Sequence, residues 1–114
     1  MQTFNLTLED MPSKDKKLSN IVKVENFKSD KSGQPIANQF RIDDHPDIYF
    51  QSYDKTIVKI DYSNNGIIQT FLDQKYWNYS NTTGKYRNIF LGETIKDTRA
   101  KIKSGEYILT DLNK

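Results

Sequence analysis

The chain has no cysteine, a single histidine, three prolines and five glycines among 114 residues. Without cysteine, disulfides, thiol catalysis and thiolate-ligated zinc or iron–sulfur centres are excluded. No apolar run approaches the roughly 20 residues of a membrane-spanning helix. The N-terminus also lacks the basic flank and apolar stretch of a signal peptide. The sequence therefore predicts a cytoplasmic protein without a membrane partner.

Motifs that carry chemistry are also scarce. The one histidine, His45, stands in an acidic turn with Asp44 and Asp47. A histidine in such a turn is more often solvated than functional, and one histidine without cysteine does not make a typical zinc site. Nucleotide-binding glycine loops and nucleophile motifs are missing as well. We predict that the protein is not an enzyme and has no catalytic residues, no metal site and no cofactor.

Alternating apolar and polar residues predict most of the fold. Period-two patterns indicate strands, and Asn65-Gly66 is a strong signal for a hairpin. The expected strands cover residues 20–27, 39–43, 48–53, 55–62, 67–72 and, near the C-terminus, 106–112. The first five form an antiparallel meander, and the last returns to the same sheet.

The period changes to that of a helix after residue 80. Ser80 or Asn81 is a suitable N-cap and Gly92 a suitable C-cap. A second helix is expected from Thr94, which has an aspartate three residues later as in a capping box, and it ends before Gly105. The predicted class is α+β: an antiparallel meander of about five to six strands with two short helices near the C-terminus.

The first residues form a separate unit in this interpretation. Phe4, Leu6 and Leu8 alternate with polar residues, and a polar linker containing Pro12 follows. We expect residues 1–18 to be an arm and linker and residues 19–114 a single α+β domain. The arm is either a frayed terminus or an apolar strand that pairs with another subunit, which would make the protein a homo-oligomer.

Charge is unevenly distributed although the net charge is only +2. Aspartates dominate residues 43–61, whereas lysine and arginine dominate residues 75–103. The basic segment also contains the only tryptophan and several tyrosines. Cations that meet phosphates, rings that stack on bases and hydroxyls that donate to phosphate oxygens are the components of a nucleic-acid surface. The candidate nucleic-acid-binding residues are Trp77, Tyr79, Thr82, Thr83, Lys85, Tyr86, Arg87, Lys96, Arg99 and Lys103.

The same residues have a simpler interpretation. Trp77 and Tyr86 would cover the sheet, Ser80 and Asn81 would cap the helix, and the lysines would be solvated. The mixture of Tyr, Trp, Asn and Arg also suits a protein interface. Both alternatives remain open from the sequence.

Three blocks of sequence resemble a known group of proteins: residues 38–53 around Tyr49-Phe50-Gln51-Ser52-Tyr53, residues 77–93, and residues 103–113. The chain is similar over residues 19–113 to a family of small uncharacterised proteins carried by bacteriophages and mobile elements of gut bacteria. No activity comes with this resemblance. It implies a location in the bacterial host cytoplasm, or in the virion. A phage setting implies one of two classes: a factor that binds DNA or RNA, or an anti-defence inhibitor or virion component that binds a host or phage protein. Between the nucleic acids, we expect DNA rather than RNA.

Overall fold

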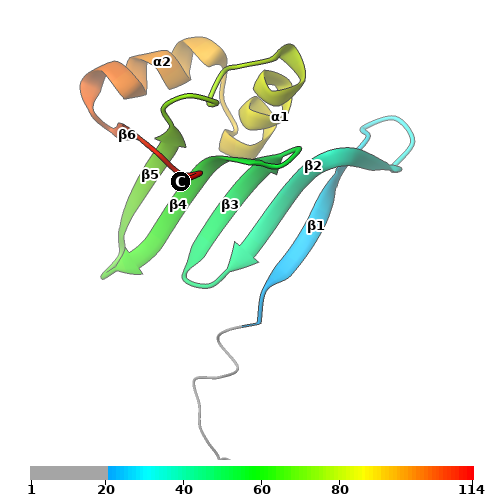
Figure 1. The fold of residues 1–114 in the computed structure, drawn as a ribbon, viewed down its shortest axis with the longest axis horizontal. Helices are drawn as coiled ribbons and strands as arrows, with labels where there is room; N and C mark the ends of the chain where they lie inside the picture. Colours follow the sequence, from blue (N-terminus) through cyan, green and yellow to red (C-terminus); the bar gives the residue numbers. More distant parts are fainter. Residues whose placement is uncertain (1–20) are drawn as a thin grey trace, which may run out of the picture.

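Alternating side chains build a six-stranded sheet within residues 21–114, the part of the chain that the computed structural model describes. The strands lie in sequence order, and the two helices follow β5, as drawn in Figure 1. The elements are β1 (Lys23–Lys28), β2 (Pro35–Asp44), β3 (Asp47–Ser52), β4 (Lys55–Asn64), β5 (Ile67–Asp73), α1 (Asn81–Leu91), α2 (Ile95–Ser104) and β6 (Tyr107–Thr110). The predicted α+β class, with its meander and two C-terminal helices, is confirmed; the predicted N-terminal arm lies outside the described residues.

The last strand pairs with its neighbour in parallel. The first four strand pairs are antiparallel, whereas β6 runs parallel to β5, with Leu109 opposite Leu72. A parallel pair needs a long crossover, because the chain must return to the end from which it started. Helices α1 and α2 supply that crossover, which explains why they lie between the two strands in the sequence.

Strand β2 is longer than the sequence predicts. It begins at Pro35 and not at Gln39, although Asn38 has a left-handed backbone (φ 65°). The pairing with β1 shifts register between Asn26 and Lys28, and the Asn26 side chain donates to the Ile36 carbonyl. A bulge of this kind tolerates residues that are typical of turns. Because Pro35 and Asn38 are such residues, the sequence pattern placed the start of the strand too late.

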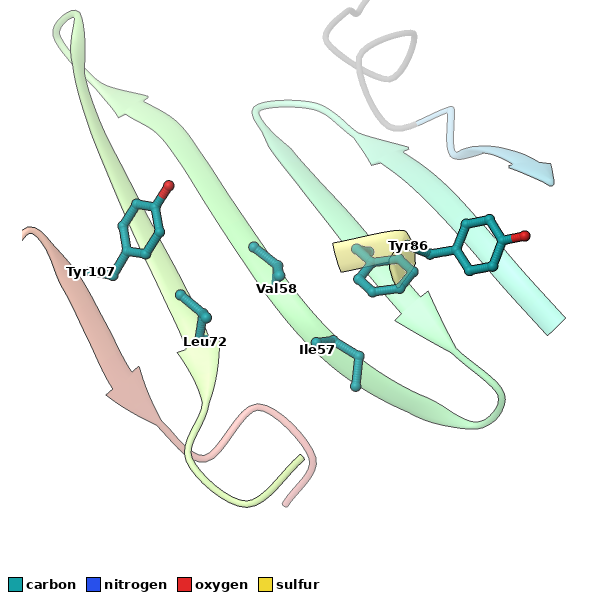
Figure 2. Close-up of a cluster of buried hydrophobic side chains, with 6 residues drawn as sticks. Ile57, Val58, Leu72, Tyr86 and Tyr107 are labelled. Carbon is teal, nitrogen blue, oxygen red and sulfur yellow. The ribbon is translucent and has the colours of Figure 1, made fainter. Parts of the chain in front are cut away.

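The hydrophobic core lies between the helices and one face of the sheet. Phe50, Val58 and Leu72 are opposite one another on β3, β4 and β5 and are fully buried. Figure 2 shows Val58, Leu72 and Tyr107 along adjacent strands. Phe90 of α1 stacks on Phe50 with ring centres 5.8 Å apart. Aromatic packing of the helices against this face therefore holds the two layers together.

Within residues 21–114, no helix lies on the opposite face of the sheet. Neighbouring residues of a strand point to opposite faces, so the residues next to the core row form a second row. This uncovered row crosses all six strands in register: Val24, Ile42, Tyr49, Lys59, Phe71 and Ile108. Its interior members are only partly buried, and Val24 and Ile108 at the ends are exposed.

The helix ends follow the predicted capping residues. The Ser80 hydroxyl accepts a hydrogen bond from the Thr83 N–H, and Thr94 and Asp97 form a complete capping box. Gly92 and Gly105 both adopt the left-handed conformation after the last turn. Neither helix is long and apolar enough to span a membrane within residues 21–114.

Candidate nucleic-acid interface

Arg87 lies inside the protein and not on its surface. Only 1% of the residue is exposed. Its guanidinium donates to the Trp77 carbonyl (2.8 Å), the Asn78 side chain (3.0 Å) and the Asn88 side chain (2.9 Å), and it lies 5.3 Å from the Trp77 ring centre. Burial, and then the charge of Arg99, lower the pKa of Arg87. The prediction that Arg87 contacts phosphate is corrected, because its donors already hold the loop before α1.

Thr83 and Tyr86 are also parts of the fold. Thr83 is fully buried and its hydroxyl is 2.8 Å from the Ser52 hydroxyl, which connects α1 to the end of β3. Tyr86 is 8% exposed and packs edge-on against Phe27. Neither can offer much surface to a nucleic acid, so both are withdrawn from the predicted contact set.

The Tyr79 side chain, just before α1, is exposed and can contact a nucleic acid, whereas the Trp77 side chain is only partly exposed. Tyr79 is 43% exposed, and its ring meets that of Tyr76 edge-on at 5.2 Å. Trp77 is partly buried, packs against the core and lies beside Arg87. Of the two rings, Tyr79 is therefore the better placed for stacking on a base.

Four of the positively charged residues in the predicted contact set do lie on the surface: Lys85 on α1, and Lys96, Arg99 and Lys103 on α2. The α2 residues share one side of the helix, because they are spaced three and four residues apart. The ion pairs within residues 21–114 join Lys59 to Asp47 and Lys101 to Glu93. None of the four cations therefore has an acidic partner in this part of the chain. Thr82 is exposed beside Lys85, and we call these five residues together with Tyr79 the basic helical surface.

Two lysines that the sequence did not single out lie close to Lys85. A cavity of about 270 Å³ separates α1 from the turn between β1 and β2. It is lined by Lys28, Ser29, Asp30, Lys31, Ile36, Lys85, Tyr86 and Ile89. More than 50 residues separate Lys28 and Lys31 from Lys85 in the chain, so no local pattern could have indicated that they meet.

The turn that carries Lys28 and Lys31 is held by its own backbone. The Ser29 N–H donates to the Gln34 carbonyl, and the Gly33 N–H donates to the Ser29 carbonyl, each at 2.9 Å. Gly33 has a φ of 71°, which glycine adopts without strain. The lysines are therefore presented from a defined turn, although their side chains are exposed.

A buried carboxylate, that of Glu93, connects α2 to β6 through hydrogen bonds. Glu93, between α1 and α2, accepts hydrogen bonds from Thr98 (2.6 Å), Lys101 (2.7 Å) and Tyr107 (2.8 Å). Burial by itself would raise the pKa of Glu93, but these hydrogen bonds outweigh it and lower that pKa. Lys101 is thereby committed to the fold and does not contribute to the basic helical surface.

A second buried carboxylate, Asp73, joins the end of β5 to the C-terminal segment. It accepts from the backbone N–H groups of Lys75, Tyr76 and Leu112 at 2.8–3.0 Å. Burial alone would raise the pKa of Asp73. The hydrogen bonds from Leu112 and Tyr76 outweigh this effect, so the pKa is lowered. Both carboxylates are thus stabilised in the charged form in the folded protein.

These two groups predict a loss of stability in acid. Because the folded protein binds protons at Glu93 and Asp73 more weakly than the unfolded chain, their stabilising effect is complete above their ordinary pKa values of 4.5 and 3.8. It is lost as pH falls through and below that range. Urea unfolding between about pH 3 and pH 7 measures this effect. The double variant Glu93→Gln/Asp73→Asn should show a flatter profile; an unchanged profile would contradict the assignment.

The described residues hold no group of three or more His, Cys, Asp or Glu side chains arranged to hold a metal ion. The candidate interface presents exposed ammonium, guanidinium, hydroxyl and phenol groups. Such groups bind anions and polar surfaces through charge and hydrogen bonds.

Comparison with known proteins identifies a family. No curated protein and no solved structure is significantly similar to this chain. A family model described as a family of unknown function (DUF8033) matches residues 22–107. The match begins near the start of the described structure and includes all of the basic helical surface. Because it covers well over half of the sequence, the chain belongs to this uncharacterised family, DUF8033.

Proposed function

We propose that this protein is a non-enzymatic nucleic-acid-binding protein that uses the basic helical surface, namely Tyr79, Thr82, Lys85, Lys96, Arg99 and Lys103. In this proposal it belongs to bacteriophages or mobile elements, binds DNA in preference to RNA, and acts in the host cytoplasm or the virion. The observation that carries the proposal is the set of four exposed cations without acidic partners in residues 21–114.

The separation of charge along the strands supports this proposal. Asp44, Asp47 and Asp61 lie opposite one another on β2, β3 and β4, at the beginning of β3. The other end of β3 reaches α1 through the hydrogen bond between Ser52 and Thr83. The acidic row is thus at the end of the sheet away from α1. A polyanion would be attracted to the helical end and repelled from the other.

Binding should weaken steeply as salt concentration rises, because every neutralised phosphate releases counterions. Fluorescence anisotropy with labelled single-stranded and duplex DNA and RNA, at about 50 to 200 mM salt, measures this dependence. The triple variant Lys96→Ala/Arg99→Ala/Lys103→Ala should make the slope of log K against log salt on single strands shallower by about 2. Each lost phosphate contact contributes about 0.7 to that change.

A variant with the same change in charge provides the control. Lys23, Lys59 and Lys114 lie outside the basic helical surface, and their replacement by alanine should leave the slope close to that of the wild type. If no nucleic acid is retained at low salt, the proposed function is wrong. If both triple variants lose the same amount of binding, net charge and not this surface is responsible.

The uncovered row of the sheet favours a second candidate, a protein-binding module. Ile42, Tyr49 and Phe71 are partly exposed on the face that neither α1 nor α2 covers, and aromatic side chains are common anchors of protein interfaces. The partner would be a host or phage protein, or a second copy recruited by the N-terminal arm. Light scattering of the full chain and of a variant lacking residues 1–12 tests the latter; an unchanged monomer in both would end it.

A further inference from the structure

The cavity between the β1–β2 turn and α1 combines charge with an apolar floor. Lys28, Lys31 and Lys85 are among its lining residues, and Asp30 is the one acidic residue of the lining, so the formal charge of the lining residues is positive. Ile36 and Ile89 line the same space together with Tyr86. The Lys85 ammonium lies 5.4 Å from the centre of the Tyr86 ring, an arrangement that favours a fixed cation.

We propose that this cavity binds one unpaired nucleotide of a single-stranded nucleic acid. The lysines would contact its phosphate, while the base would lie against the side chains of Ile36 and Ile89. The inference rests on the proposed function and deepens it, because it names the form of nucleic acid and adds Lys28 and Lys31 to the binding residues.

The size of the cavity argues for a single nucleotide. Its volume of about 270 Å³ lies just below the range of about 300–1,000 Å³ that is usual for small-molecule sites. A helix or strand of a partner does not fit such a space, whereas one base with its phosphate is of the right order. A duplex keeps its bases stacked and paired, and extracting one costs a few kcal/mol. A single strand avoids that cost, so the cavity selects single strands.

The test compares single-stranded DNA of about 12 nucleotides, within the usual site sizes of small binding domains, with the same sequence as a duplex. The full-length wild type should bind the single strand about tenfold more tightly at equal salt. The double variant Lys28→Ala/Lys31→Ala should lose most of that preference, with a smaller effect on the duplex. Lys28, Lys31 and Ile89 are exposed, so their replacement should leave the unfolding midpoint close to that of the wild type. Ile36 packs against the core, so Ile36→Ala should lower the midpoint and is compared at a temperature where it is folded.

The variants Ile89→Ala and Ile36→Ala separate base contact from charge. Each should weaken single-strand binding severalfold without changing the salt slope, because no charge is removed. Polyphosphate, which has no bases, should bind Ile89→Ala and wild type equally. Equal affinity of the wild type for single strand and duplex, or an equal loss on polyphosphate, overturns the nucleotide site while leaving salt-dependent binding to the basic helical surface intact. Absence of any nucleic-acid binding overturns both.

Discussion

Replacing Arg87 with alanine is expected to lower the free energy of unfolding by about 3 kcal/mol, because it removes three hydrogen bonds from a charged, buried donor and leaves their partly buried acceptors unpaired. The acceptors are the Trp77 carbonyl and the side-chain oxygens of Asn78 and Asn88. Loss of the guanidinium would release the loop that precedes α1. Chemical denaturation followed by circular dichroism measures the change.

Two further substitutions show whether Arg87 acts through structure or through binding. Arg87→Lys keeps the charge but lacks the planar set of donors that reaches several acceptors, so it should be destabilised almost as much as the alanine variant. Lys85→Ala, on the exposed side of the same helix, should alter stability by less than about 0.5 kcal/mol. A stable Arg87→Lys protein would argue against the structural role.

Replacing Phe50 with alanine is expected to cost about 3–5 kcal/mol, as is usual for a large buried aromatic residue. Phe50 is fully buried and its ring contacts those of Phe27 and Phe90 at centre distances of 5.5 and 5.8 Å. The cavity left by the ring would lie between the sheet and α1, where Phe90 stacks on Phe50. Since domains of this size are stable by only about 5–15 kcal/mol, the variant should be close to unfolding at ambient temperature.

Phe71→Ala is the matched control, because Phe71 lies on the opposite face of the same sheet. Its ring is partly exposed and lies 5.9 Å from the Lys59 ammonium. As a monomer the variant should lose only about 1 kcal/mol, in the range of ordinary surface-proximal substitutions. A loss as large as that of Phe50→Ala, and dependent on protein concentration, would mean that a second copy covers the uncovered row.

Much of the fold was predictable because its signals are local. Alternation of apolar and polar residues specified the strands, and Asn65-Gly66 specified a hairpin. The ends of the helices were indicated by Ser80 and Thr94 at the N-termini and by the C-cap glycines Gly92 and Gly105. These features depend on backbone conformation and on neighbours a few residues away. The start of β2 was missed, because a bulge permits Pro35 and Asn38 within a strand.

The candidate site was only half predictable, for a physical reason. Residue type and charge pattern identified Lys85, Lys96, Arg99 and Lys103, which are indeed exposed. They could not distinguish Arg87, since burial of a guanidinium depends on the carbonyl and amide oxygens that the loop before α1 places around it.

By itself, the sequence determined the strands, the helices and their caps, the absence of thiol chemistry, and the concentration of positive charge after residue 75. Only the tertiary structure decided which face of the sheet the helices cover and which aromatic residues form the core. It also decided that Lys28 and Lys31 meet Lys85 across a cavity. Such contacts join residues far apart in the chain, and they depend on strand register and helix packing, which no local pattern encodes.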